Sequence, residues 1–156
     1  MLAARPDQKV LGFLGRALSL ELSAVQQYST QARMVASWGL SEAADSFRKE
    51  ADEELQHVNR IIERMLAVGV APAGSQLRPV NLAKDLSALL RINQKFEADV
   101  IQMYQSAARY CAGQGDHDNR VFFEELLKAE QQHLAELDAW LHRLQEVPQQ
   151  RMSGSR

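Results

Sequence analysis

Apolar residues recur every three or four positions along almost the whole chain. This spacing places them on one face of an α-helix, so the pattern predicts an all-α protein. Breaks rich in Gly, Pro and Asp divide the pattern into four stretches. We therefore expect four helices, over residues 9–38, 41–69, 81–113 and 116–146.

The ends of these helices carry recognisable signals. Gly39 follows the first stretch as a left-handed stop, and Ser41 and Asn81 can cap the second and third helices. Asp116 or Asp118 can start the fourth helix, and Pro148 ends it. We expect one domain over residues 1–147, followed by a polar, disordered tail over residues 148–156.

The lengths of the connections predict the topology. Short turns after the first and third helices make each pair an antiparallel hairpin. The middle connection, residues 69–81, contains Pro72 and Pro79 and is longer than a bundle turn needs. About 12 extended residues span roughly 40 Å, and a helix of about 28 residues is about 42 Å long. We expect a four-helix bundle in which one long crossover leaves the second and third helices parallel.

A single glutamate interrupts each of the four apolar stripes. An isolated ionised carboxylate in a core costs on the order of several kcal/mol unless it is paired or bound to a metal. Four carboxylates in one place would also repel one another, and bound cations remove that repulsion. The glutamates are Glu21, Glu54, Glu97 and Glu130.

Two of these glutamates begin the same short motif, Glu54-x-x-His57 and Glu130-x-x-His133. Glu21 and Glu54 lie 18 residues before and 15 residues after Gly39, and the second hairpin repeats both distances around Gly115. The ligands of one hairpin therefore fall at similar depths, with each histidine one turn from its glutamate. The repeat predicts a dinuclear metal site, and carboxylates with imidazoles suit Fe(II).

Composition and charge exclude other classes of function. The net charge of −2 and the pI near 6.1 give no electrostatic footprint for nucleic acid. Cys111 is the only cysteine, so an internal disulfide and a Cys-x-x-Cys motif are both excluded. No apolar run reaches the length of a membrane span and no signal peptide is recognisable, so we expect a cytoplasmic protein without membrane partners.

From about Lys9 to Leu144 the chain resembles the bacterioferritins. The resemblance is carried by residues 20–40 (LELSAVQQYSTQARMVASWGL), 53–66 (EELQHVNRIIERML) and 128–141 (KAEQQHLAELDAWL). It implies that Glu54 and Glu130 bridge two irons and that Tyr28 lies beside them. It also implies that Glu21 with His57 holds one iron and Glu97 with His133 the other, so that the ferroxidase ligands are Glu21, Glu54, His57, Glu97, Glu130 and His133.

By this resemblance the protein is a ferroxidase that oxidises Fe(II) with O₂ or H₂O₂ for iron storage or detoxification. The family assembles as a 24-subunit shell, and a 12-subunit shell of mini-ferritin type is the alternative. Three positions depart from the family. Leu55 replaces the methionine that ligates haem, so we expect no haem; Lys49 replaces a histidine of an inner-surface iron site; and the short fifth helix is missing after Pro148.

Other functions remain open on the same residues. The scaffold also carries mini-ferritin-like protectors against oxidative stress and non-haem di-metal peroxidases or catalases. A function of another class is a non-catalytic shell subunit that binds metal and co-assembles with a haem-bearing partner. Oxidation of added Fe(II) under air, as opposed to binding without oxidation, separates these hypotheses.

Overall fold

A computed structural model of the chain describes residues 6–74 and 76–146. Within them lie four helices and no strand, so the predicted all-α four-helix bundle is confirmed. The helices are α1 (Gln8–Ser37), α2 (Ser41–Ala67), α3 (Leu86–Gly113) and α4 (His117–Gln145). The expected disordered tail, residues 148–156, lies outside the described part of the chain.

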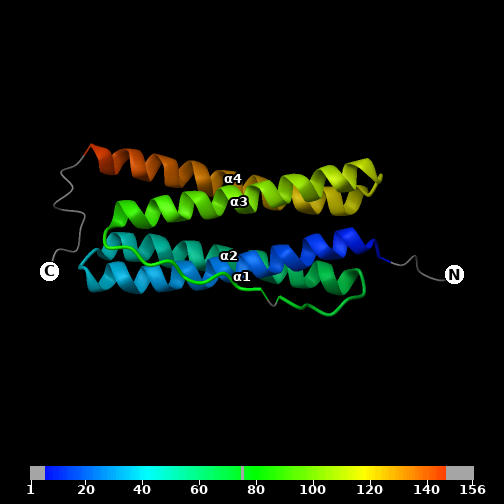
Figure 1. Cartoon of the computed structure of the whole chain (residues 1–156), viewed down its shortest axis with the longest axis horizontal. Helices are drawn as coiled ribbons and strands as arrows, with labels where there is room; N and C mark the ends of the chain where they lie inside the picture. Colours follow the sequence, from blue (N-terminus) through cyan, green and yellow to red (C-terminus); the bar gives the residue numbers. More distant parts are fainter. Residues whose placement is uncertain (1–5, 75, 147–156) are drawn as a thin grey trace.

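The helices form two antiparallel pairs, α1 with α2 and α3 with α4 (Figure 1). The chain leaves α2 at one end of the bundle and runs back along the α1–α2 pair before α3 begins at the other end (Figure 1). Consequently α2 and α3 run in the same direction, whereas α2 and α4 run in opposite directions. The predicted long crossover is confirmed, and it decides how the site is assembled.

The sequence signals placed most helix ends within one or two residues. Asp7 caps α1 by accepting hydrogen bonds from the backbone N–H groups of Lys9 and Val10, and Asp116 caps α4. Gly39 has a φ of 81°, which is the left-handed conformation expected after α1. The prediction for Ser41 was wrong, because it is the first residue of α2 and the cap residue Leu40 makes no side-chain hydrogen bond.

The predicted start of the third helix was also wrong. Asn81 does not cap α3, because its backbone already pairs with the side chain of Gln27 on α1. The Asn81 N–H donates to Gln27 Oε1 and the Gln27 amide donates to the Asn81 carbonyl, both at 3.1 Å. The crossover therefore continues to Asp85, whose carboxylate accepts a hydrogen bond from the N–H of Ala88.

The crossover packs tightly against α1. The hydroxyl of Ser23 accepts a hydrogen bond from the Arg78 N–H at 2.9 Å. A Cβ on Gly74 would lie only 2.8 Å from Leu18 Cγ, so a larger residue there would displace the connection or the core. These contacts, with the Gln27 pair, fix the path of a segment that has no secondary structure of its own.

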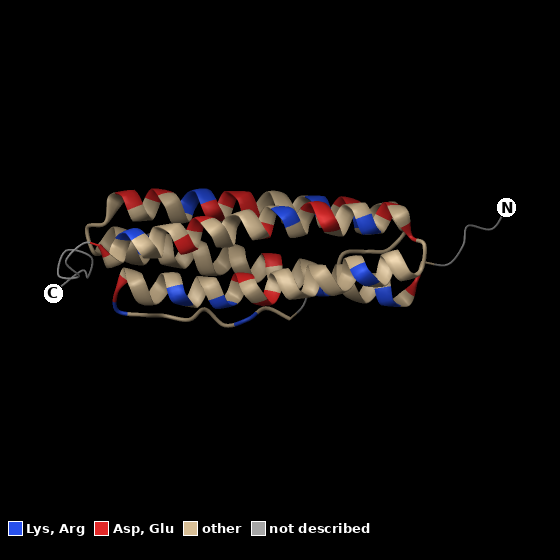
Figure 2. Cartoon of the chain, turned by 90° about the horizontal axis from the view of Figure 1, so that it is seen from above, with Lys and Arg blue, Asp and Glu red and all other residues tan. Residues whose placement is uncertain are grey.

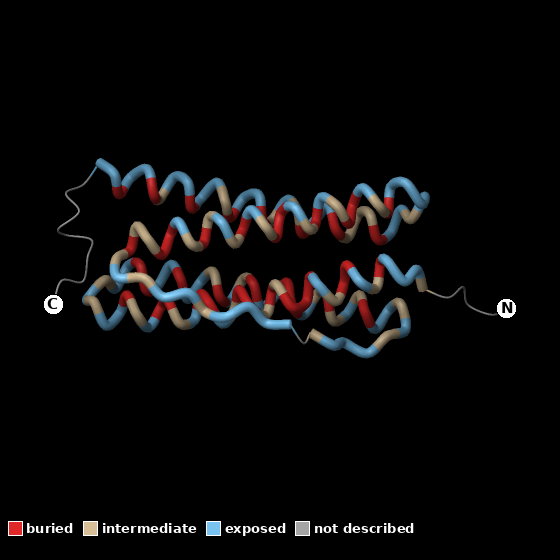
Figure 3. Tube along the Cα trace, viewed as in Figure 1, coloured by how far each residue is buried: buried red, intermediate tan, exposed pale blue. Residues whose placement is uncertain are grey.

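The buried residues face the interior of the bundle along all four helices (Figure 3). Two apolar clusters fill its two ends, one around Leu14, Ile61 and Phe123 and the other around Phe47, Leu90 and Leu137. Val25 on α1 and Leu134 on α4 are only half-buried. Between the two clusters lies a layer of charged side chains.

Acidic and basic residues are interspersed along the helices, without a face of one sign in this view (Figure 2). This agrees with the absence of a basic footprint in the sequence. None of the four helices is both long and apolar enough to span a bilayer, as judged over the described residues.

Candidate metal centre

The charged layer in the middle of the bundle is built from the six residues selected by the sequence. Ligand atoms of Glu21, Glu54, His57 and Glu130 lie within 4.8 Å of one another, and so do those of Glu54, Glu97, Glu130 and His133. All six residues are buried. Because Glu54 and Glu130 belong to both groups, they lie between two adjacent positions for a cation.

Each histidine turns its Nδ1 atom towards the shared carboxylates. His57 Nδ1 is 2.9 Å from Glu130 Oε1 and 3.5 Å from both Glu21 Oε2 and Glu54 Oε2. His133 Nδ1 is 2.8 Å from Glu54 Oε1 and 3.5 Å from Glu130 Oε2. Each imidazole therefore contacts a carboxylate from its own helix pair and one from the other pair.

Several atoms of this layer are buried without a hydrogen-bond partner, which is costly unless a cation binds them. A hydrogen-bonded network of structural residues would satisfy these atoms, so the donor set fits metal ions better than a polar core. Hard carboxylate oxygens with two imidazole nitrogens are ligands for divalent iron and its neighbours. The carboxylate oxygens without a partner are Glu21 Oε2, Glu97 Oε2 and Glu130 Oε2, whereas Glu54 Oε1 and His133 Nδ1 face each other at 2.8 Å.

The proximity of the carboxylates changes their proton affinities. Burial raises the pKa of Glu54 to about 8, and the neighbouring charge of Glu21 adds to the rise. Burial also acts to raise the pKa of Glu21, but hydrogen bonds with Glu54 and His57 lower it to about 2. Burial raises the pKa of Glu130 to about 7 and that of Glu97 well above its usual value.

The two histidines hold protons strongly when no cation is bound. Burial lowers the pKa of each, but hydrogen bonds to the carboxylates outweigh it and raise the pKa of both His57 and His133 to about 12. A metal ion needs the neutral imidazole and the ionised carboxylate. Binding of metal must therefore release protons from this layer.

Two buried tyrosines complete the layer. Tyr28 on α1 donates a hydrogen bond to Glu97 Oε1 at 2.5 Å, and Tyr104 on α3 donates to Glu21 Oε1 at 2.8 Å. Tyr28 was singled out from the sequence, whereas Tyr104 was not. The sequence does contain a signal for Tyr104, because each of the two tyrosines follows the glutamate of its own helix by seven residues.

Two acidic residues of α2 that the sequence analysis missed contact His133, one at each nitrogen of its ring. Glu53 Oε2 lies 2.7 Å from His133 Nε2, and Glu50 Oε2 lies 3.6 Å from His133 Nδ1. Both come from the turn of α2 that precedes Glu54, so the antiparallel packing of α2 on α4 brings them to the histidine. The signal for them in the sequence was only proximity to the motif, which did not distinguish them from solvent-facing acids.

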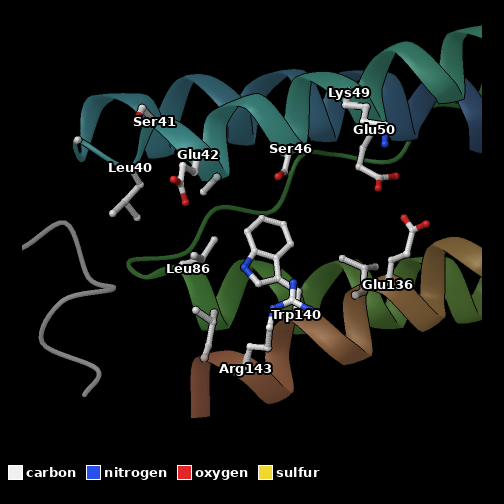
Figure 4. A pocket seen from close by; sticks show the side chains of 14 residues that line it. Leu40, Ser41, Glu42, Ser46, Lys49, Glu50, Leu86, Glu136, Trp140 and Arg143 are labelled. Atoms are coloured by element: carbon white, nitrogen blue, oxygen red, sulfur yellow. The ribbon is translucent and has the colours of Figure 1, made fainter. Parts of the chain in front are cut away.

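A cavity of about 780 Å³ opens between the first half of α2 and the last half of α4. Glu50 lines this cavity and also contacts the metal centre through His133. In Figure 4 the carboxylates of Glu50 and Glu136 point towards one another, with Lys49 near Glu50 and the Trp140 ring nearer the end of the bundle. The Glu50 side chain thus lies both at the wall of the cavity and 3.6 Å from His133 Nδ1.

Comparison with known proteins shows the family of the chain. The family described as the Ferritin-like domain matches residues 12–147. The bacterioferritin of Rhodobacter capsulatus is 34% identical over 128 residues, which cover 82% of this chain and 80% of that protein. The chain belongs to the bacterioferritin family. A second member, from Brucella melitensis, is 30% identical over 145 residues, covering 93% and 90% of the two chains.

A solved structure of a bacterioferritin has the same fold. The Rhodobacter capsulatus protein superposes with a TM-score of 0.90 at 31% identity, over 94% of this chain and 92% of that one. That structure is described as having a metal-free dinuclear site and haem iron in a crystallographic special position. The resemblance to the bacterioferritins stated from the sequence is therefore confirmed.

Proposed function

We propose that this member of the bacterioferritin family is a ferroxidase that oxidises Fe(II) at the six-residue centre. The observation that carries the proposal is the set of buried, unpartnered carboxylate oxygens beside two imidazoles. In this proposal Glu54 and Glu130 bridge two Fe(II) ions. Glu21 with His57 holds one ion, and Glu97 with His133 holds the other.

The electron acceptor is O₂ or H₂O₂. Two Fe(II) ions give one electron each, which reduces one H₂O₂ to two waters with two protons, or one O₂ to H₂O₂ with two protons. The four carboxylates supply the negative charge that a pair of Fe(III) ions requires. Four carboxylates and two imidazoles do not fill the coordination of two ions, so positions remain open for the oxidant.

The product Fe(III) serves storage or detoxification, and we propose that it accumulates inside a homo-oligomeric shell of 24 subunits, with 12 as the alternative. The names of the relatives, all bacterioferritins, support storage. Leu55, which is 46% exposed on α2, offers no donor atom, so we expect no haem bound through this position. If the shell contains haem, a haem-bearing partner subunit would supply the haem ligand.

Anaerobic loading with Fe(II), followed by exposure to air, tests the chemistry. We expect O₂ uptake that saturates near two Fe(II) per chain in a stopped-flow or electrode assay. Glu54→Ala and Glu130→Ala should lose at least about a hundredfold of the rate, because even outer residues of metal sites cost tenfold to a hundredfold. Glu63→Ala, an exposed position on the same helix, is the matched control.

Binding of Fe(II) without O₂ uptake would contradict the ferroxidase and favour the non-catalytic metal-binding subunit. Catalytic loss of H₂O₂ without net oxidation of iron would instead favour the peroxidase or catalase. Sedimentation of the purified protein, before and after loading beyond two irons per chain, tests the shell and the storage of iron.

A further inference from the structure

Two tyrosine–glutamate pairs cross between the halves of the bundle in a matched way. Tyr28 on α1 donates to Glu97 on α3, and Tyr104 on α3 donates to Glu21 on α1. Both rings are completely or almost completely buried, at 1% and 0% exposure. Each metal position therefore has one phenol hydrogen-bonded to a carboxylate assigned to it.

A third tyrosine provides a contrast within the same chain. Tyr110 donates at 2.7 Å to Asp7, at the end of the bundle, and that hydrogen bond is exposed. Asp7 belongs to none of the groups of possible metal ligands among the described residues. A hydrogen bond between a phenol and a carboxylate is thus not unusual here, but only Tyr28 and Tyr104 make one inside the metal centre.

The buried hydrogen bonds matter for electron transfer. A phenol that loses an electron in a dry core would leave a positive charge there, at a cost of several kcal/mol or more. Transfer of the phenolic proton to the hydrogen-bonded carboxylate keeps the ring neutral. Tyr28 and Tyr104 each have such an acceptor at 2.5 and 2.8 Å, so each can release an electron and a proton together.

The proposed function leaves an electron deficit that these residues can fill. Reduction of O₂ to two waters takes four electrons, and two Fe(II) ions supply only two of them. A site with no other donor makes H₂O₂ in its first turnover, and this H₂O₂ can diffuse away before a second pair of Fe(II) ions at the centre reduces it. Two further one-electron donors at the same centre would complete the reduction.

Resting on the proposed ferroxidase function, we propose that Tyr104 is an electron donor to O₂ reduction and acts as the counterpart of Tyr28. Both O–H bonds break, and their protons leave through Glu21 and Glu97 while their electrons join the two from Fe(II). With two protons from solvent, one O₂ becomes two waters, two Fe(II) become Fe(III) and the two phenols become neutral phenoxyl radicals. Each radical then returns to a phenol by taking one electron from a further Fe(II) and one proton from solvent.

The experiment is a single turnover with two Fe(II) per chain and excess O₂, quenched by freezing and examined by electron paramagnetic resonance. In Tyr28→Phe, we expect a remaining tyrosyl radical signal that disappears in Tyr28→Phe/Tyr104→Phe. Tyr110→Phe is the matched control and should leave the signal unchanged. A Co(II) titration of each variant should still show two ions per chain, because phenylalanine preserves the packing of the ring.

The yield of H₂O₂ under multiple turnovers supplies a second readout. The wild type should consume about four Fe(II) per O₂ and release little H₂O₂. The double variant should release H₂O₂ into solution, at most about one per O₂, and its consumption of Fe(II) should fall from about four towards two per O₂. Tyr104→Phe alone should release several times more H₂O₂ than the wild type.

The inference is overturned if O₂ is consumed normally while Tyr28→Phe gives no radical, or if Tyr104→Phe leaves the H₂O₂ yield at the wild-type value. In either case the ferroxidase itself stands. If the wild type binds Fe(II) but consumes no O₂, the proposed function fails and this inference fails with it. A radical in Tyr28→Phe, lost on adding Tyr104→Phe, supports it.

Discussion

The two halves of the candidate metal centre have matching inner residues but differ in their outer ones. A shift of 76 positions carries Glu21, Tyr28, Glu54 and His57 of the first hairpin onto Glu97, Tyr104, Glu130 and His133 of the second. The outer side of His133 faces the carboxylates of α2. The same shift replaces Glu50 with Leu126 and Glu53 with Ala129, so His57 has no such neighbours on α4.

The difference teaches that ligand chemistry is repeated here while the surroundings are not. A carboxylate on the outer nitrogen of a ligating histidine fixes the ring and raises its basicity. His133 has that partner in Glu53 at 2.7 Å. Leu126, the counterpart of Glu50, is completely buried in an apolar cluster. The surroundings of His133 on α2 are thus acidic, whereas the matching positions of α4 near His57 are apolar.

The two apolar clusters at the ends of the bundle also differ, because only one of them lies beside a buried polar pair. At one end, the buried amides of Gln31 and Asn93 bond to each other twice, at 2.8 and 2.7 Å. The shift of 76 positions maps this pair onto Ala107 and Ala17, which are buried in the other cluster. One end of the core therefore contains a polar pair where the other contains two methyl groups.

Metal loading should have the largest effect, and it acts on both halves together. A folded-state pKa raised from 4.5 to about 8, as for Glu54, stabilises the metal-free fold fully below pH 4.5 and ceases to do so as the pH rises through 8. Metal binding has the opposite pH dependence, since it needs the protons removed. Co(II) at a thousand times its Kd should add about 4 kcal/mol per site.

Thermal unfolding at pH 5 and pH 8, with Co(II) or with a chelator, measures this effect. We expect a larger increase in Tm from Co(II) at pH 8 than at pH 5. Glu54→Ala should remove most of the increase. Equal shifts at the two pH values would show that the layer binds the metal without giving up protons.

Removing one histidine at a time should separate the two halves. His57→Ala and His133→Ala should each weaken one of the two Co(II) sites by at least about a hundredfold and leave the other intact. The His133 variant should keep more of its weakened site, because Glu50 and Glu53 remain beside the gap. Co(II) absorption titrations check this, and loss of both sites in either variant would refute independent halves.

Replacing the outer carboxylate should make the halves more alike. Glu53→Gln removes the charge that holds His133 Nε2, and we expect about a tenfold to hundredfold loss of metal affinity in that half only. Glu63→Ala serves as the control for a lost surface carboxylate on α2. An equal loss of metal affinity at the site of His57 would show that Glu53 does not act on the His133 half alone.

The smallest effect is expected at the amide pair. Asn93→Ala copies its counterpart Ala17 and strands the buried amide of Gln31, which should cost about 1–3 kcal/mol of the free energy of unfolding. Urea denaturation of Asn93→Ala, Gln31→Ala and the double variant measures the coupling. Strictly additive losses would mean that the two hydrogen bonds contribute nothing as a pair.

The sequence predicted the helices and the meeting of the six residues because both follow from local periodicity and matched distances around Gly39 and Gly115. It failed where a residue's partner is distant in the chain. Asn81 was predicted to cap the third helix. Its actual partner, Gln27, is 54 positions away in the sequence, so the local pattern did not reveal it. The role of Glu53 likewise depends on how α2 packs on α4. Tyr104 resembled core until its oxygen was placed beside Glu21.

The crossover contains none of the six residues, but it decides how the two imidazoles are divided between the two candidate metal positions. Because it returns along the bundle, α2 and α4 run in opposite directions, and each Glu-x-x-His motif advances towards a different end. A tight turn in its place would make the two motifs point the same way. Both imidazoles would then lie at one candidate metal position, and the other position would have only carboxylate oxygens. The crossover therefore gives each position one imidazole, which the two motifs alone do not determine.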